Sequence, residues 1–308
     1  MSLPLLLLAT TSMLMLGASL SFGSAIVPGF NATSDGRNDD GTYTTGGCNN
    51  DTPGGTCAGT PVPIGFSVNF YGTTSDSLFI NTNGDVTFDA PLATFTPFSL
   101  DDALRQIIAP FFADLDTRNP ASGVVTFGDG TFDGRNAFGV NWIDVGYFDQ
   151  EVDNTNSFQL LLVDRADTGA GNFDLVFNYD RILFETGDAS FGIGGLGGLS
   201  ARIGFSNGTG LPGDSFELPG SGIPGSFIDG GTNALVTNSL NSDVAGRYIF
   251  SARDGQIPVN TDTPEPGTYF MLAAGSVLLL LNRRFSLLET SAKFCARERR
   301  PRFRRLRS

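Results

Sequence analysis

Short apolar runs separated by turn residues recur along residues 61–253 and constrain the fold more than any other feature of the sequence. In the first run, apolar residues at positions 64, 66, 68 and 70 alternate with Gly, Ser and Asn, as in a strand with one buried face. Asn83-Gly84 separates two further runs, and this dipeptide is a strong signal of a β-hairpin. About ten such runs predict an all-β fold, either an antiparallel β-sandwich or a barrel-like domain. A single domain can accommodate them.

Three local segments depart from simple alternation. Between Phe138 and Tyr147 the apolar residues change phase, which predicts a β-bulge or twist within one long strand. Asp101–Gln106 is the one segment expected to form a helical turn. The Gly-rich run Phe191–Leu199 has a glycine spacing similar to that of nucleotide-binding loops, but it contains no Lys and lacks the required strand–turn–helix setting. It therefore predicts a hairpin or a flexible loop.

The stretch IIAPFFADLDTR, from Ile107 to Arg118, is an apolar run that ends in two carboxylates, Asp114 and Asp116. A run of this kind is typical of a buried strand. Aspartates two residues apart on an extended chain project from the same face. Two interpretations remain open: a core strand that leaves the sheet through a polar turn, or a cation site or acidic contact surface at the strand's end. No cofactor is expected, and the ion that such a site would take is calcium.

Charge and composition exclude some classes of function. Residues 1–267 contain nine Arg, no Lys and 30 Asp and Glu, which gives this part a formal net charge of −21. Nucleic acid is therefore not an expected partner, because phosphate binding needs a basic surface. The chain contains no His, so the commonest general base and metal ligand is missing. A Ser–His or Cys–His hydrolase is excluded for the same reason.

The first 25 residues resemble a secretory signal peptide, with an apolar core from Leu3 to Leu16 followed by small residues, although no Lys or Arg precedes the core. Residues 26–60 form a polar segment rich in Gly and Asn, with little periodicity. Cys48 and Cys57 enclose a short loop there and are expected to pair as a disulfide in a secreted chain. The carboxylates of this segment resemble a calcium loop, but their spacing lacks the acidic residue that closes one. They are Asp35, Asp39, Asp40 and Asp51.

Several motifs agree in order with one known family. IIAPFFADLDTR, AFGVNWIDVGYF, FQLLLVDR and FDLVFNYDRI resemble the nidogen-type extracellular domain, called NIDO, and INTNGDVTF and SLNSDVAGRYIF fit its bacterial versions. The resemblance covers roughly Pro61 to Arg253, so a NIDO-like β domain is assigned to residues 61–253. It implies an extracellular, non-catalytic module associated with cell–matrix adhesion. The family offers no catalytic residues to carry over.

A second resemblance follows a linker at residues 254–263. Residues 264–284 resemble the PEP-CTERM sorting signal of Gram-negative bacteria, which an exosortase-type enzyme is thought to process. The triplet is Pro264, Glu265 and Pro266, the apolar membrane-anchor helix runs from Tyr269 to Leu281, and Arg283 and Arg284 follow it. The resemblance implies a protein that is secreted or held at the cell surface and is transiently anchored in the inner membrane. Residues 285–308 continue as a basic tail of doubtful origin.

Two functions from different classes follow. The first is an adhesive protein that binds extracellular polysaccharide or a matrix protein, with Tyr71, Tyr147 and Phe148 either stacking on sugar rings or lying in the core. The alternative is a secreted, carboxylate-dependent glycoside hydrolase that uses Asp114 and Asp116, with Asp144 as a further candidate acid. Alternate strand residues lie roughly 6–7 Å apart, a distance between the carboxylate separations of retaining and inverting enzymes.

Overall fold

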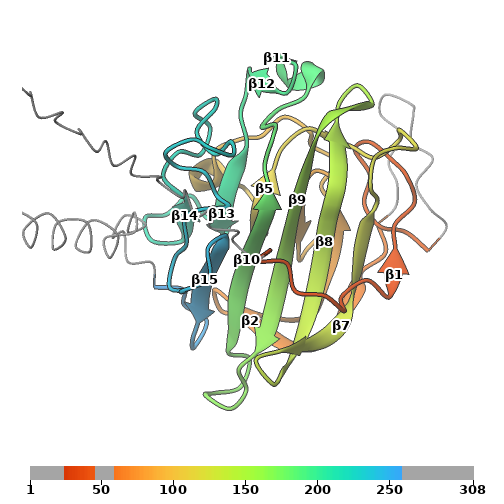
Figure 1. The fold of residues 1–308 in the computed structure, drawn as a ribbon. Helices are drawn as coiled ribbons and strands as arrows, with labels where there is room; N and C mark the ends of the chain where they lie inside the picture. Colours follow the sequence, from red (N-terminus) through yellow and green to blue (C-terminus); the bar gives the residue numbers. More distant parts are fainter. Residues whose placement is uncertain (1–23, 46–58, 259–308) are drawn as a thin grey trace, which may run out of the picture.

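The computed structural model describes residues 24–45 and 59–258, which form two antiparallel sheets that pack face to face (Figure 1). The strands of the first sheet are β1 (Thr33–Ser34), β6 (Leu115–Asp116), β7 (Val125–Phe132), β8 (Arg135–Tyr147), β9 (Glu151–Asp164), β10 (Phe173–Arg181) and β15 (Arg247–Ala252). Its order is β1-β7-β8-β9-β10-β15, and β6 pairs with β8 outside this order.

The second sheet has the order β14-β13-β5-β4-β3-β2, an open path like that of the first. Its strands are β2 (Val62–Phe70), β3 (Thr73–Asn81), β4 (Asp85–Thr87), β5 (Ile107–Phe112), β13 (Arg202–Ser206) and β14 (Ser215–Glu217). Among the described residues neither sheet closes into a barrel. Of the two predicted architectures, the fold is therefore the sandwich.

Aromatic side chains from both sheets meet in the core between them. The ring centroid of Phe158 in β9 lies 5.3 Å from that of Phe111 in β5. On the neighbouring strand β8, Trp142 stacks on the same Phe158 ring at 5.1 Å. Further along the sandwich, Phe205 of β13 packs edge-on against Phe250 of β15 at 5.2 Å. Each fully buried aromatic of this size contributes roughly 1.5–3 kcal/mol through apolar burial. The alternating sequence pattern thus supplies one layer of core from each sheet.

Two local predictions are confirmed. β3 and β4 form the expected hairpin around Asn83-Gly84, with Asn81 opposite Asp85. Gly84 has φ +83°, and a Cβ at this position would collide with the backbone carbonyl of Phe111. In β8, the register against β9 shifts between Trp142 and Val145, which accounts for the change of phase in the sequence.

Short elements complete the fold. The expected helical turn is a single 3-10 turn, η1 (Leu100–Asp102). The Gly-rich run forms a hairpin of two short strands, β11 (Gly192–Ile193) and β12 (Leu196–Gly197), which follow a second 3-10 turn, η2 (Asp188–Ser190), and extend from one end of the sandwich (Figure 1). No described helix is long and apolar enough to cross a membrane.

Residues 24–45 are part of the sandwich, in contrast to the separate polar segment that the sequence predicts. β1 pairs with β7, with Thr33 opposite Phe127. The buried ring of Phe30 lies over Gly130 and Gly139, where a Cβ on either glycine would meet the ring at 2.7 or 2.6 Å. These contacts join residues far apart in the chain, so local periodicity could not reveal them. The β domain therefore begins before residue 61.

Several predicted features lie outside the described residues. They include the signal peptide, the cysteine pair, the sorting triplet and the apolar anchor with its arginines. The residues concerned are Cys48, Cys57, Pro264, Glu265, Pro266, Tyr269, Leu281, Arg283 and Arg284.

Candidate functional site

The two aspartates singled out in the sequence lie where β5 is followed by β6. Asp114 lies in the bend between the strands and Asp116 lies in β6, and both side chains are fully buried. Oδ2 of Asp114 accepts a hydrogen bond from the backbone N–H of Ser190 at 3.0 Å. Asp116 accepts instead from the guanidinium of Arg118 and from the backbone N–H of Gln150 at 2.9 Å. Because the chain bends here, the two carboxylates have separate partners and do not act as a matched pair on one extended strand.

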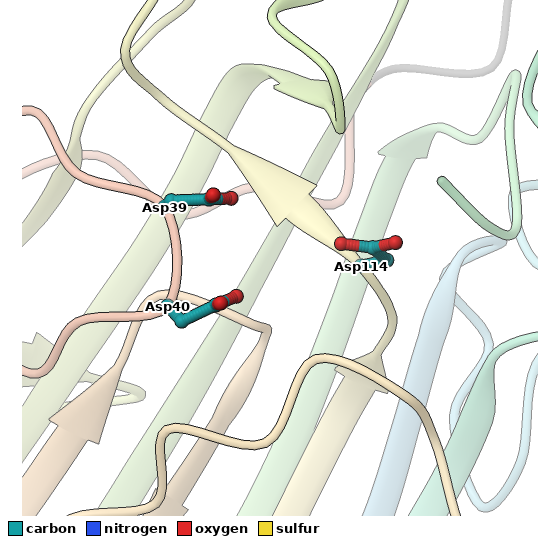
Figure 2. Close-up of side chains that lie close together, drawn as sticks. All are labelled: Asp39, Asp40 and Asp114. Carbon is teal, nitrogen blue, oxygen red and sulfur yellow. The ribbon is translucent and has the colours of Figure 1, made fainter. Parts of the chain in front are cut away.

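Asp114 lies beside two other carboxylates, those of Asp39 and Asp40 in the N-terminal segment. One carboxylate oxygen from each of the three lies within 4.8 Å of the others. Figure 2 shows the side chains of Asp39 and Asp40 extending from their segment toward one end of the Asp114 carboxylate. The sequence does point to each residue, but it places them in unrelated motifs. The third carboxylate of this group, that of Asp114, comes from a different part of the chain.

Asn38 shapes the loop that carries Asp39 and Asp40. Its side-chain oxygen accepts hydrogen bonds from the backbone N–H of Gly41 at 2.8 Å and from the hydroxyl of Thr82 at 2.5 Å. Its side-chain amide donates to the carbonyl of Gly36 at 2.9 Å. The backbone of Asn38 exchanges hydrogen bonds with Thr117, just beyond β6. The N-terminal loop is thus held against the hairpin turn of the second sheet and against the chain that leaves β6.

Asn83, in that hairpin turn, links the loop to the bend. Its side-chain amide donates to Oδ1 of Asp40 at 3.1 Å, and its side-chain oxygen accepts from the backbone N–H of Leu115 at 2.9 Å. Its backbone carbonyl accepts from the N–H of Ala113 at 3.1 Å. The turn residue predicted as a hairpin signal therefore also fixes the positions of Asp40 and of the backbone on both sides of Asp114.

Arg118 brings positive charge to one side of this group. Its Nη2 lies 2.6 Å from Oδ2 of Asp116, 3.1 Å from Oδ2 of Asp39 and 3.2 Å from Oδ1 of Asp149. Its guanidinium also lies 5.5 Å from the ring centroid of Phe148. The hydrogen bond to Asp116 is the main cause of a raised pKa of the Arg118 guanidinium. Arg118 thus neutralises the outer side of the group.

The carboxylates of Asp39, Asp40 and Asp114 are poorly solvated and repel one another. Burial, followed by the charges of Asp40 and Asp116, raises the pKa of Asp39 to about 8. Burial, followed by the charge of Asp40, raises the pKa of Asp114 to about 7. Burial also raises the pKa of Asp40. Oδ1 of Asp39 and Oδ1 of Asp114 are buried and have no hydrogen-bond partner. Such a group can bind a cation or a proton.

The acids considered for glycoside hydrolysis are not arranged for attack on a polymer. Asp114 and Asp116 are both 0% exposed. Asp144 is exposed and has φ +56° at the bulge of β8, but it forms an ion pair with Arg181 on the outer surface. The three candidates therefore do not line a common accessible surface.

The aromatic residues considered for sugar stacking are largely covered. Tyr147 is buried, and its hydroxyl donates to Oδ1 of Asp153 at 2.8 Å. Tyr71 is partly buried and packs against Phe70, with a ring-centroid distance of 4.9 Å. Phe148 is partly buried and contacts Arg118. The alternative interpretation, in which these residues belong to the core, holds for Tyr147.

Comparison with known proteins identifies relatives of the β domain. The family model for the nidogen-like domain matches residues 76–131 and 126–254. Human alpha-tectorin is 32% identical over 224 residues, which cover 65% of this chain and 10% of that protein. Chicken alpha-tectorin is 27% identical over 218 residues, covering 62% of this chain and 10% of that protein. Drosophila melanogaster nidogen is 25% identical over 222 residues, covering 64% of this chain and 15% of that protein.

These matches cover only a small part of each relative, and no solved structure matches the chain. Asp114 and Asp116 lie within the region matched by the family model, whereas Asp39 and Asp40 lie before it.

Proposed function

Because the chain belongs to the nidogen-like domain family, we propose that it is an extracellular, non-catalytic protein that takes part in cell–matrix adhesion. The complete burial of Asp114 and Asp116 is the main support for a non-catalytic function. General acid–base catalysis requires a group within hydrogen-bond reach of the substrate. The alternative function, a secreted glycoside hydrolase, relies first on Asp114 and Asp116, which a substrate cannot reach.

The proposed location is outside the cell or at the surface of a Gram-negative bacterium, after transient anchoring in the inner membrane. Its support comes from the sequence: the apolar segment at residues 3–16, the triplet Pro264–Pro266 and the apolar run 269–281 before two arginines. The proposed processing partner is an exosortase-type enzyme, and the proposed membrane contact is the apolar run 269–281. The intact mass of the native product tests this proposal, because a C-terminus near residues 263–267 is expected and retention of Cys295 would contradict it.

The hairpin β11–β12 favours a matrix protein over a polysaccharide as the adhesive partner. Phe191 is 75% exposed and Ile193 is 86% exposed, and the hairpin extends from the end of the sandwich (Figure 1). Leu196 and Leu199 of the same segment are also exposed. Aliphatic and aromatic side chains gathered on one projection are typical of a protein-binding surface. A sugar-binding surface would instead present aromatic faces with hydrogen-bonding groups.

Co-sedimentation tests the proposed function directly. The full-length protein is mixed separately with the polysaccharide fraction and with the protein fraction of the producing organism's extracellular matrix. Binding to the protein fraction, with the polysaccharide retaining its length, is the expected result. Shortening of the polysaccharide would overturn the non-catalytic assignment, and the loss of that shortening in Asp114→Asn would identify the acid responsible. Binding to the polysaccharide alone would reverse the preference for a protein partner.

A further inference from the structure

The arrangement of Asp39, Asp40 and Asp114 offers oxygen ligands to a single ion. An ion with oxygen ligands at about 2.3–2.6 Å, as in calcium sites, separates ligands on opposite sides by roughly 4.6–5.2 Å. The three carboxylate oxygens lie within 4.8 Å of one another, which agrees with one shared ion. We propose that these three aspartates form a binding site for one divalent cation of the calcium type.

Independent support comes from the oxygens that the protein leaves without partners. Asp114 is 0% exposed and Asp39 is 7% exposed, yet Oδ1 of each accepts no hydrogen bond. Their other oxygens are used, by the N–H of Ser190 and by Arg118 respectively. Buried polar atoms are nearly always paired because desolvation without a partner is costly. The two unpaired oxygens belong to carboxylates that face each other across the group (Figure 2). A bound cation would satisfy both.

The local charge favours the same ligand. Asp39, Asp40, Asp114 and Asp116 bring four carboxylates together, and among the described contacts Arg118 provides the guanidinium that pairs with two of them. Arg118 binds Asp39 through Oδ2 and so does not occupy Oδ1. Ionised carboxylates this close to one another repel. A divalent cation reverses this repulsion, because it is the largest charge in the site.

The ligand set favours calcium over magnesium. All three ligands are carboxylates, and hard cations take oxygen ligands. Magnesium prefers near-ideal octahedral geometry, retains several waters and is usually held by one or two carboxylates, whereas this site offers three. Calcium tolerates longer and less regular spacing. The site contains neither His nor a described Cys, so soft transition metals are not favoured.

An ion at this position would link the N-terminal segment to the bend between β5 and β6 and, through Asp114, to Ser190. Asp39 and Asp40 belong to the N-terminal segment, and Asp114 to the bend between β5 and β6. Through its other oxygen, Asp114 also holds the backbone of Ser190, at the base of the β11–β12 hairpin. Binding of the cation would therefore hold the N-terminal segment on the sandwich and fix one support of the exposed hairpin.

Calorimetric titration of the chelator-treated, full-length protein with calcium chloride tests the proposal. One calcium ion per chain is expected, with a dissociation constant in the range of about 10⁻⁴–10⁻³ M that extracellular modules show. Asp40→Asn should weaken binding by about tenfold or more, because affinity depends on the number of charged ligands. This variant retains the side-chain oxygen that accepts from Asn83. Asp149→Asn is the matched control, because Asp149 contacts Arg118 but is not one of the three proposed ligands. The calcium affinity of this variant should stay within about twofold of that of the parent.

Thermal unfolding gives a second readout that a purely structural role would not produce. Without calcium, Asp40→Asn and Asp114→Asn should melt at the same temperature as the parent or higher, because each replaces a buried carboxyl group with a neutral amide of the same shape. With calcium at 10–100 times the dissociation constant of the parent, the parent Tm should rise by about 3–10 °C, and the Tm of each variant should rise clearly less. The absence of calcium binding by the parent would overturn the proposal. Unchanged affinity in Asp40→Asn, or magnesium binding as tight as calcium binding, would do the same.

Discussion

The carboxylate oxygens of Asp39 and Asp114 lie within 4.8 Å of each other, although four strands of the second sheet, β2 to β5, separate the two residues in the chain. Their approach depends on Asn38 and Asn83, whose side chains hold the N-terminal loop and the bend after β5 against the same hairpin turn. Five predictions follow from this relationship and from other buried contacts of the sandwich.

Calcium should slow hydrogen exchange in two separate segments. The segments are residues 33–42 and 113–116, because the proposed ion joins them and local opening must break its ligand bonds. Hydrogen-exchange mass spectrometry of the full-length protein, with calcium and with chelator, measures the effect. The hairpin of β7 and β8 at residues 130–137 serves as an internal control and should not change. Equal protection in all segments would indicate general stabilisation in place of a local ion.

Stability should fall as pH rises through the titration range of Asp85. This carboxyl is fully buried, burial raises its pKa to about 7, and the hydrogen bond from Asn81 only partly offsets this. The folded protein therefore keeps a proton that the unfolded chain releases at lower pH. The free energy of unfolding should decrease between about pH 4 and pH 7, by up to about 4 kcal/mol from this group, and level off above pH 7.

Asp85→Asn tests this pH dependence, because an amide stays neutral throughout. Urea unfolding at acidic and at mildly alkaline pH should show that the variant loses less stability than the parent as pH rises. Asp89→Asn, an exposed change next to the same hairpin, is the control and should follow the parent. If the free energy of unfolding changed with pH in the same way for the parent and for Asp85→Asn, Asp85 would not be the group responsible.

Phe30→Ala should destabilise the whole sandwich. The buried ring fills the space above Gly130 and Gly139, so its removal leaves a cavity and weakens the hold of the N-terminal segment. The expected loss is about 3–5 kcal/mol in the free energy of unfolding, measured with denaturant. Pro28→Ala, an exposed change in the same segment, should alter stability by less than about 0.5 kcal/mol. A Phe30→Ala loss as small as that of the control would show that residues 24–45 do not contribute to the domain.

Glu185 should be essential to the loop that precedes β15. It is fully buried, and its two oxygens accept hydrogen bonds from the backbone N–H groups of Gly225 and Phe227, both at 2.5 Å, and from the hydroxyl of Ser200 at 2.7 Å. Glu185→Gln places an amide NH₂ opposite a donor and should cost about 2–4 kcal/mol. Ser200→Ala removes only one donor and should cost about 1 kcal/mol. Thermal unfolding of both variants measures the difference, and equal losses would contradict it.

The exposed hairpin should carry the adhesive contact. The double variant Phe191→Asn and Ile193→Ser removes its most exposed apolar side chains, and Asn tolerates the φ of +68° at position 191. Binding to the matrix protein fraction should fall by about tenfold or more, with Tm unchanged. Leu104→Ser is the control, because Leu104 is 93% exposed but lies beside η1. Equal loss in the control, or no loss in the double variant, would move the contact to another surface.

The local parts of the fold could be predicted from neighbouring residues alone. The hairpin at Asn83-Gly84, the bulge in β8 and the hairpin within Phe191–Leu199 each depend on alternation or on glycine within a few positions. The sequence predicts Asp114 as a site residue, and the structure brings it to the carboxylate group. Asp114 and Asp116 have different hydrogen-bond partners, which local spacing did not predict: Asp114 accepts from Ser190, whereas Asp116 accepts from Arg118 and Gln150.

By itself the sequence determined the class of fold, because strand alternation, turn residues and acidic composition are local properties of the chain. Only the tertiary structure decided which sheet faces which, that residues 24–45 belong to the domain, and that Asp39, Asp40 and Asp114 share one position. These features arise from strand pairing and side-chain packing between distant segments. Their physical basis is contact across space, which residue spacing along the chain does not encode.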